Sequence, residues 1–263
     1  TVTPDPQRVA KIIRDVAENI ILPRFQQLAS HEISVKSSGD LVTVADKEAE
    51  QALGMALRGL LPGSAIVGEE EAAERPNVLK ALLGHDPVWV VDPVDGTQNF
   101  ANGETCFAVI VALVCGGKTV AGWIHEPIED ATVWALNGEG AYEADKRLKP
   151  DAPEHAGNIN GSLSRRYNER LERRRIELDS GNKQQLPKPA VRYRCVGAEY
   201  NDLARGRLQY ACYSGWLKPW DHLAGVLIHA ESGGFSALVE TGAALEPGPE
   251  LRQQTILLAP NEK

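Results

Sequence analysis

Acidic side chains gather at three places in the sequence, each at the end of a predicted element. Glu69–Glu71 follow a short apolar stretch, Asp92 and Asp95 follow a strand-like run, and Asp221 lies where a helix is predicted to begin. Hard divalent cations bind carboxylate and carbonyl oxygens. Mg²⁺ also keeps several waters, so a few carboxylates and the phosphate oxygens of a substrate complete its coordination. These residues therefore offer enough oxygen ligands for a magnesium site.

The residues around the second acidic cluster offer a metal half and a phosphate half. A proline between Asp92 and Asp95 restricts one backbone dihedral angle, so a tight loop can aim both carboxylates at one point, where the Val94 carbonyl can join them. Gly96 and Thr97 follow at once, and their backbone N–H groups allow close approach of a phosphate oxygen. A cation and a phosphate group are therefore expected to meet in this loop.

Each of these signals, taken alone, also has an ordinary structural interpretation. Asp-Pro and Asp-Gly are common turn dipeptides, and a run of three glutamates is usually a solvated surface. His222, beside Asp221, fits a packing or surface role better than a ligand role. For a cluster of arginines, a solvated helix face is favoured over binding of RNA or an acidic partner protein. These are Arg165, Arg166, Arg170, Arg173, Arg174 and Arg175.

Taken together, five segments resemble the inositol monophosphatase family. The string from Asp92 to Phe100, D-P-V-D-G-T-Q-N-F, is similar to the family signature D-P-[IV]-D-G-T-x-N-F. Shorter elements resemble the family's D-L-V-T-x-x-D, G-E-E, W-D-x-A-A-G and E-A-G-G, in the family's order: Asp40–Asp46, Gly68–Glu70, Trp220–Gly225 and Glu231–Gly234. The resemblance spans residues 36 to 234 and implies a phosphomonoesterase.

The resemblance implies a set of metal ligands, with two to three Mg²⁺ ions as the cofactor. Glu69, Asp92 and the Val94 carbonyl would hold one ion. Asp92, Asp95 and Asp221 would hold a second, with Asp92 bridging, and a third, looser ion would lie near Glu69. Paired cations neutralise phosphoryl oxygens, lower the pKa of water and stabilise a departing alkoxide. In-line attack by water then needs no covalent intermediate.

The resemblance also implies catalytic and supporting residues. Glu69 and Thr97 would position and activate the attacking water, while Asp46 would orient the Thr97 hydroxyl. Lys36 and Glu70 would support the metal site indirectly.

Substrate selection is expected in the second half of the chain. The resemblance places Gly197, Ala198, Glu199 and a loop over 213–219 around the non-phosphate part of the substrate. Family members that act on inositol phosphate carry a glutamate where Ser214 stands, and Glu199 replaces a usually small residue. A polyol or sugar phosphate is favoured, with histidinol phosphate, fructose 1,6-bisphosphate and phosphoadenosine phosphate as alternatives. The carboxylate of Glu199 would suit a cationic substrate such as histidinol phosphate.

The hydrophobic patterns supply the elements that must hold these residues. Helices are predicted at about 9–21, 45–61, 165–176, 196–204 and 220–231. Strands are predicted at 33–36, 66–67, 88–91, 191–195, 208–213 and 235–239, with an antiparallel meander of three strands over 107–136. This alternation is α/β in character, and the resemblance implies a sandwich of alternating helix and sheet layers.

A polar stretch over 149–160 is expected to separate two halves of the chain. The N-terminal α+β half, residues 1–148, carries most of the proposed metal ligands. The C-terminal α/β half, residues 149–263, carries Asp221 and the loops that select the substrate.

Composition bounds the class of protein. The chain has 263 residues, 43% of them hydrophobic, and a net charge of −8, which argues against a protein that grips nucleic acid. Four cysteines form no zinc or disulfide pattern. No apolar run reaches the length of a membrane span and no secretion signal is evident, so a cytoplasmic protein is expected.

The expected partner is a small-molecule phosphate ester, with no membrane. The resemblance further implies a homodimer and inhibition by lithium. A hypothesis of another class is an interaction protein with a vestigial site, but the intact acidic set argues against it, because clustered carboxylates repel one another unless a cation offsets them.

Overall fold

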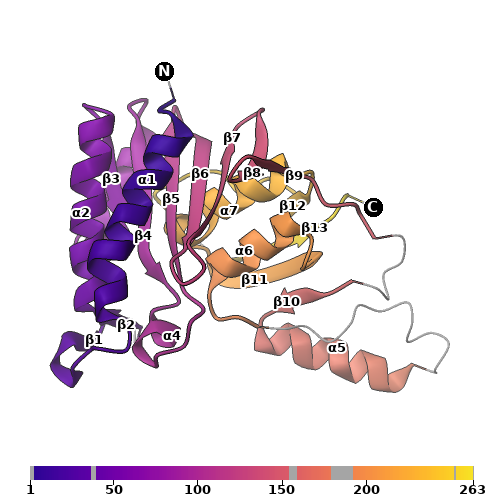
Figure 1. Ribbon diagram of the computed structural model, residues 1–263. Coiled ribbons are helices and arrows are strands. Elements are labelled where there is room, and N and C mark those ends of the chain that lie inside the picture. Colours follow the sequence, from indigo (N-terminus) through magenta and orange to yellow (C-terminus); the bar gives the residue numbers. More distant parts are fainter. Residues whose placement is uncertain (1–2, 37–39, 154–158, 179–191, 252, 263) are drawn as a thin grey trace.

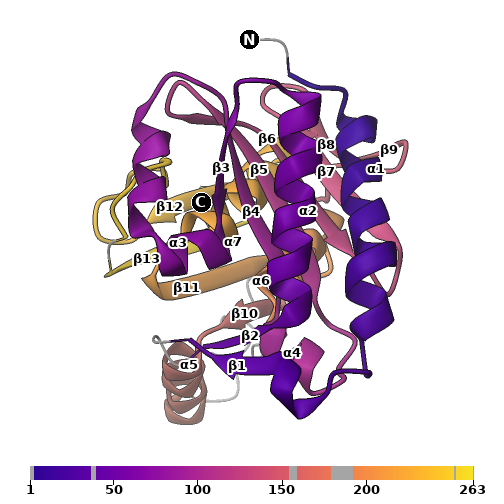
Figure 2. The same cartoon turned by 90° about the vertical axis from the view of Figure 1, so that its left-hand side faces the viewer.

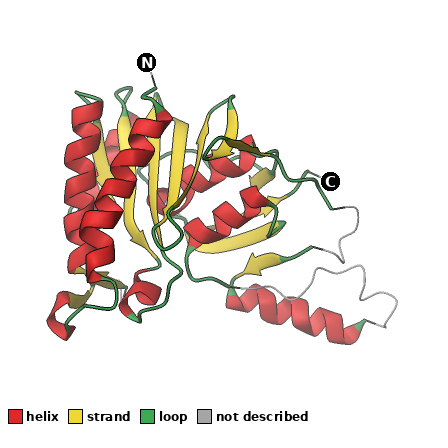
Figure 3. Cartoon of the chain, viewed as in Figure 1, coloured by secondary structure: helices red, strands yellow, loops and turns green. Residues whose placement is uncertain are grey.

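Layers of helix and sheet alternate across the molecule (Figure 1, Figure 3). The structure is a computed structural model that describes residues 3–36, 40–153, 159–178, 192–251 and 253–262. Two long helices cover one face of a large sheet, two more helices cover its other face, and a smaller sheet lies beyond them. The predicted α/β sandwich is confirmed.

The first layer consists of α1 (Pro6–Val16) and α2 (Val44–Leu60). Helix α1 begins where the Asp5 side chain accepts a hydrogen bond from the Gln7 backbone N–H at 2.9 Å. Its apolar stripe is buried, and the chain then continues through a π-helical turn (Ala17–Ile21) and a 3₁₀ turn (Leu22–Arg24). Figure 2 shows both long helices side by side in front of the large sheet.

The large sheet has seven strands in the order β3-β4-β5-β6-β7-β8-β9. Strands β3 and β4 run parallel and all later neighbours are antiparallel, which confirms the predicted meander. The strands are β3 (Ala65–Gly68), β4 (Val88–Asp95), β5 (Ala108–Cys115), β6 (Lys118–Glu126), β7 (Ala131–Leu136), β8 (Gly140–Glu143) and β9 (Lys146–Leu148). Strands β4 and β5 are buried along almost their whole length because helices cover both faces of the sheet.

The other face of this sheet packs against α6 (Val196–Arg205) and α7 (Pro219–Glu231). Beyond them lies a four-stranded sheet in the order β10-β11-β13-β12. Its strands are β10 (Gly161–Leu163), β11 (Tyr210–Trp216), β13 (Gln253–Ala259) and β12 (Phe235–Leu238). The arginine-rich helix α5 (Arg165–Glu177) borders β10 at the edge of the molecule (Figure 1). One hydrophobic cluster joins Val90 and Ile110 of the large sheet to Leu223 and Ile256 of the second half. The predicted boundary between two halves of the chain after residue 148 stays a prediction.

Short elements complete the end of the molecule where β4 ends. These are a β1 (Ile33–Val35) and β2 (Leu41–Thr43) hairpin, α3 (Glu69–Glu74) and α4 (Thr97–Ala101), with a 3₁₀ turn at Ser30–Glu32. A 3₁₀ helix at Pro76–Leu83 leads from α3 back to the beginning of β4. Within the described residues, no helix combines the length and apolar character needed to cross a membrane.

Three local predictions were wrong. Strand β4 continues through the expected loop to Asp95, with a shift in its pairing to β5 between Asp92 and Asp95. Residues 192–195 form no strand, since Arg194 has a φ of 57° and Cys195 is the N-cap of α6, and Val191 lies outside the described residues. Strand β11 begins at Tyr210 and extends through much of the expected loop to Trp216.

Candidate active site

The irregular end of β4 places the carboxylate of Asp92 inside the protein. The pairing shift lets the strand bend where the proline has no N–H to donate. Asp92 is only 2% exposed, and its Oδ1 accepts a hydrogen bond from the Val94 backbone N–H at 3.1 Å. The bulge therefore fixes Asp92 against its own backbone and turns the chain toward Gly96.

Gly96 makes the sharp turn from β4 into α4. Its φ is 86°, a left-handed conformation that glycine adopts without steric cost, and a Cβ there would lie 3.1 Å from the Cys106 carbonyl oxygen. Thr97 follows as the first residue of α4. Its hydroxyl lies 3.2 Å from Asp46 Oδ1 and 2.9 Å from the Val94 carbonyl oxygen, so its single hydrogen can be donated to either acceptor.

Asp46 is held at the start of α2 by a capping box. Its Oδ2 accepts hydrogen bonds from the Thr43 backbone N–H at 2.8 Å and from the Thr43 hydroxyl at 2.5 Å. Burial raises the pKa of Asp46 to about 6, and the bonds from Thr43 oppose that rise. The sequence thus brings Asp46 and Thr97 together from elements 51 residues apart.

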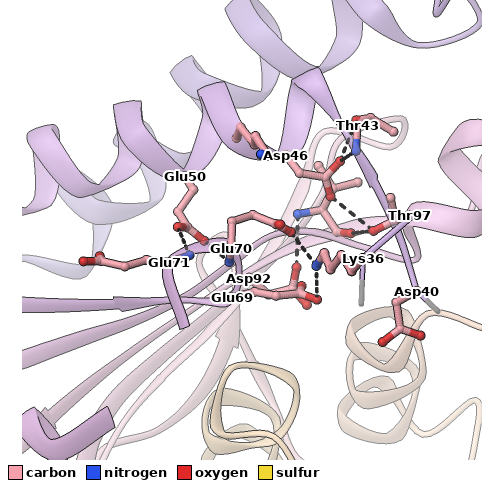
Figure 4. A network of polar contacts seen from close by, with 12 residues as sticks. Lys36, Asp40, Thr43, Asp46, Glu50, Glu69, Glu70, Glu71, Asp92 and Thr97 are labelled. Carbon is pink, nitrogen blue, oxygen red and sulfur yellow. Dashed lines mark hydrogen bonds and ion pairs between the residues drawn. The ribbon is translucent and has the colours of Figure 1, made fainter. Parts of the chain in front are cut away.

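Glu69 and Glu70 open α3 and share one cation from the chain (Figure 4). Lys36 Nζ lies 2.8 Å from Glu69 Oε1 and 2.7 Å from Glu70 Oε1. Burial opposes the charge of Lys36, but the two carboxylates outweigh burial and raise its pKa. Burial raises the pKa of Glu70 to about 7 in spite of the lysine.

Asp95 and Asp221 come from the ends of two different elements. Asp95 Oδ2 accepts hydrogen bonds from the Gly197 backbone N–H at 2.6 Å and from the Cys195 thiol at 3.1 Å, at the start of α6. Burial raises the pKa of Asp95 to about 6, against these two bonds. Asp221 lies in the first turn of α7, where burial and the charge of Glu69 raise its pKa well above the usual value.

Asp92 is the electrostatic centre of this group. Burial raises its pKa well above the usual value, and the charges of Glu69, Asp95 and Asp221 raise it further, in that order. Repulsion of this kind is relieved by a cation, and an all-oxygen donor set is chemically suited to Mg²⁺. The residues present therefore fit the implied metal by donor chemistry.

The carboxylate oxygens of the site lie near one another but are not arranged as a complete metal site. Across the described ranges, no three or more carboxylate, imidazole or thiol groups are arranged so that they could hold a metal ion. Glu69 is paired with Lys36, and Asp95 is bonded to the start of α6. Lys218 Nζ lies 3.5 Å from Asp40 Oδ2 and 3.9 Å from Glu69 Oε1.

A cavity of about 710 Å³ opens beside Asp95 and Asp221. Glu199 and Ser214 line it, as expected, whereas Gly197 and Ala198 are not among its lining residues. Glu199 is buried, and its Oε1 accepts a hydrogen bond from the Tyr193 backbone N–H at 3.0 Å. Glu199 therefore braces the cavity wall with at least one of its oxygens.

His222 forms another part of the same wall. It is buried, and its Nδ1 lies 3.1 Å from the Tyr200 hydroxyl. Burial lowers its pKa to about 3, so the imidazole is neutral and packs against aromatic rings.

Two polar residues of the site, the buried Asn99 and the partly buried Glu50, were missed by sequence reasoning. Asn99 donates hydrogen bonds to the carbonyls of Cys106 and Tyr193, at 2.8 and 2.9 Å, and so ties α4 to the cavity wall. It lies inside the matched signature, which was the available signal. Glu50 accepts two backbone hydrogen bonds at the start of α3, and its spacing of four from Asp46 puts both residues on one helix face.

Comparison with known proteins gives a consistent result. The model of the inositol monophosphatase family matches residues 5–262. A fructose-1,6-bisphosphatase/inositol-1-monophosphatase of Aquifex aeolicus is 31% identical over 237 residues, which are 88% of this chain and 84% of that protein. The Nus factor SuhB of Pasteurella multocida is 30% identical over 224 residues, or 83% of this chain and 79% of that protein.

Solved structures agree on the fold. An IMPase of Thermotoga maritima superposes with a TM-score of 0.76 at 22% identity, and the match covers 95% of this chain and 90% of that one. At this identity the likeness shows the fold alone.

Proposed function

The chain belongs to the inositol monophosphatase family, and from this membership we propose that it is a magnesium-dependent phosphomonoesterase acting on a small polyol or sugar phosphate. The family places it among the phosphoric monoester hydrolases. One observation carries the proposal: the charges of Glu69, Asp95 and Asp221 surround the buried Asp92. The hydrogen-bonded pair of Thr97 and Asp46 lies beside them.

Two to three Mg²⁺ ions are the proposed cofactor. Glu69, Asp92 and the Val94 carbonyl would hold one ion, and Asp92, Asp95 and Asp221 a second. When bound, such cations neutralise phosphoryl oxygens and lower the pKa of water. The raised pKa values of the aspartates fit this role, because a cation reverses the repulsion that raises them.

The residues around Thr97 would orient the attacking water. When Thr97 donates its hydroxyl hydrogen to Asp46 Oδ1, the lone pairs of Oγ1 are left to accept a hydrogen from water. Asp46, with a pKa of about 6, can then take up the proton through Thr97 near neutral pH. Glu69 would accept the second hydrogen of this water. The backbone N–H groups of Gly96 and Thr97 would face a phosphoryl oxygen.

The cavity beside Asp95 would hold the alcohol part of the substrate. Ser214 offers a hydroxyl for hydrogen bonding to a sugar or polyol, and Glu199 shapes the wall. A second candidate is a sugar bisphosphate, since Arg192 and Arg194 also line the cavity and present cationic side chains to a second phosphate. The name of the Aquifex aeolicus relative includes that activity.

Phosphate release from a panel of esters tests the proposal. The panel contains inositol 1-phosphate, fructose 1,6-bisphosphate, histidinol phosphate and phosphoadenosine phosphate, each assayed with Mg²⁺ and with EDTA. Turnover that needs Mg²⁺ and is lost in Asp92→Asn is expected, and the order of the esters identifies the substrate class. If the unaltered chain hydrolyses none of them with Mg²⁺, the proposal is wrong and a binding role takes its place.

Three further properties belong to the same proposal. Lithium is expected to inhibit turnover by competing for a magnesium position, which a titration at fixed Mg²⁺ measures. A homodimer is expected, and light scattering measures it. A cytoplasmic location is expected, and microscopy of the tagged chain measures it.

A further inference from the structure

Glu50 is a partly buried carboxylate behind the site that the proposed mechanism does not use. It lies on α2, one helical turn beyond Asp46, and points at the start of α3 (Figure 4). Its Oε2 accepts a hydrogen bond from the Glu70 backbone N–H at 2.7 Å, and its Oε1 accepts one from the Glu71 backbone N–H at 2.9 Å. One carboxylate therefore accepts hydrogen bonds from two successive backbone N–H groups.

Helix α3 needs such a partner from outside. It has only six residues, and a helix this short has little stability of its own. The first N–H groups of any helix lack acceptors within the helix and are usually capped by the residue that precedes it. Here that residue is Gly68, which has no side chain to cap with.

The glycine leaves room for the carboxylate of Glu50. A Cβ at Gly68 would lie 2.2 Å from Glu50 Cδ, although its φ of −95° is open to any residue. Space, rather than backbone conformation, thus requires glycine at this position. Gly68 and Glu50 therefore act together, because Gly68 leaves the space and the Glu50 side chain on α2 caps the start of α3.

We propose that Glu50 is a positioning residue that fixes the backbone N–H groups of Glu70 and Glu71 and so presets the neighbouring carboxylate of Glu69 for Mg²⁺. The inference rests on the proposed function, in which Glu69 is a metal ligand. Without the cap the first turn of α3 is free to fray, and the Glu69 carboxylate must be ordered each time a cation binds. Groups that orient a metal ligand usually contribute about 10- to 100-fold to affinity.

Glu50→Ala is the test, with Mg²⁺ binding measured by calorimetry on the full chain and turnover measured against Mg²⁺ concentration. Binding about tenfold weaker is expected, with a matching rise in the Mg²⁺ concentration for half-maximal turnover. The KM for the ester at saturating Mg²⁺ is expected to stay unchanged, which separates this role from general loss of structure.

Glu48→Ala is the matched control, because Glu48 lies on the same helix, pairs with Arg24 at 2.6 Å and is far more exposed. It should leave Mg²⁺ binding unchanged. Gly68→Ala should weaken binding by displacing the Glu50 carboxylate, yet should add little when Glu50→Ala is already present. If Gly68→Ala and Glu50→Ala weaken Mg²⁺ binding additively, the two residues do not act together.

Unchanged Mg²⁺ affinity in Glu50→Ala would overturn the inference while the unaltered chain still hydrolyses its ester. If Glu50→Ala fails to fold by circular dichroism, Glu50→Gln decides the matter. Its amide keeps one acceptor oxygen and places an NH₂ group, which is a donor, where the second oxygen accepts a hydrogen bond. An intermediate loss of affinity is therefore expected, and full affinity refutes the proposal. Absence of Mg²⁺ binding by the unaltered chain would overturn the proposed function and this inference together.

Discussion

Two largely buried acidic clusters in this molecule contact cationic side chains in different ways. The first, called the catalytic cluster after its proposed role, consists of Glu69, Asp92, Asp95 and Asp221. The Arg205 cluster consists of Glu126, Glu143 and Asp202 around the guanidinium of Arg205, between α6 and strands β6 and β8. Both lie beside the same central helix, but only one carries its own counter-ion at its centre.

In the Arg205 cluster every carboxylate contacts the same cation. Arg205 Nη1 lies 2.7 Å from Glu126 Oε2 and 3.4 Å from Asp202 Oδ1, and its Nε donates to Glu143 Oε1 at 3.1 Å. In the catalytic cluster Lys36 pairs with Glu69, but no ion pair to Asp92 is formed by the part of the chain that the structure describes.

The difference fits the role that we propose for each cluster. Buried charges usually have partners, because an unpaired one is costly to desolvate. The Arg205 cluster follows that rule and ties α6 to the large sheet. The catalytic cluster departs from it, and local departures of this kind gather at functional sites. Lys36 and Lys218 reach Glu69 at its border, but among the described residues no ion pair is formed with the central Asp92, which fits the proposed binding of a metal ion there.

Asp221→Asn should have the largest effect on the catalytic side of the comparison. Loss of a metal ligand is expected to lower kcat/KM about 10⁴-fold, since a catalytic cation contributes several kcal/mol of charge stabilisation. Stability should not fall, because the substitution removes one repelling charge from a group whose pKa is raised. Phosphate release and thermal unfolding in EDTA measure both effects, and a variant that melts lower yet turns over normally would reverse the assignment.

Arg205→Ala should show the opposite pattern. Its loss leaves Glu126 and Glu143 without their cation, while Asp202 keeps only the exposed Arg207. Breaking a buried pair of this kind costs about 4 kcal/mol. The kcat of the folded protein should be unchanged. Arg207→Ala is the control, since that exposed arginine contacts Asp202 at 3.1 Å and its loss should cost under about 1 kcal/mol. Urea unfolding gives both values, and equal costs would mean that burial of the Arg205 cluster contributes nothing.

The sequence predicted the elements of both clusters better than their contacts. Helices α2, α6 and α7 begin and end within one residue of the predicted bounds, because their apolar spacing and flanking residues are local signals. The order of the acidic motifs along the chain also implied one shared site. The bulge that carries β4 on to Asp95 was missed, because Asp-Pro and Asp-Gly are turn signals that pairing with β5 overrides.

Contacts between distant segments could not be predicted from the sequence. Glu143 lies 62 residues before Arg205, and no local pattern links them. Glu50 had a spacing signal on α2, but its partners are backbone N–H groups 20 and 21 residues away. Such contacts depend on how the helices pack on the sheet, which a local pattern does not determine.

Thr97→Ala tests whether the hydroxyl beside the catalytic cluster takes part in the chemistry. Loss of a group that orients and deprotonates water is expected to lower kcat about 100-fold. Thr97→Ser keeps the hydroxyl within reach of Asp46 and should retain most of the activity. Steady-state kinetics at saturating Mg²⁺ decide the matter, and equal loss in both variants would assign Thr97 a packing role.

The pH dependence of stabilisation by Mg²⁺ is the smallest expected effect, and it separates the two clusters directly. The pKa of Glu70 is raised to about 7 and that of Asp95 to about 6, so the metal-free folded chain keeps protons that the unfolded chain has lost. A raised carboxylate pKa lowers the stability of the folded state as pH rises toward that pKa, and the loss is complete above it.

Cation binding displaces those protons. The gain in unfolding free energy on adding Mg²⁺ should therefore grow by about 1.5 kcal/mol between pH 6 and pH 8. Buried histidines such as His125, whose pKa is lowered to about 4, act alike with and without Mg²⁺, so their contribution cancels in the difference.

Arg205→Lys should leave the gain unchanged, whereas Glu70→Gln should reduce it. Thermal unfolding with Mg²⁺ and with EDTA gives the gain, and one that is equal at both pH values would mean that Glu70 and Asp95 are already ionised without a cation.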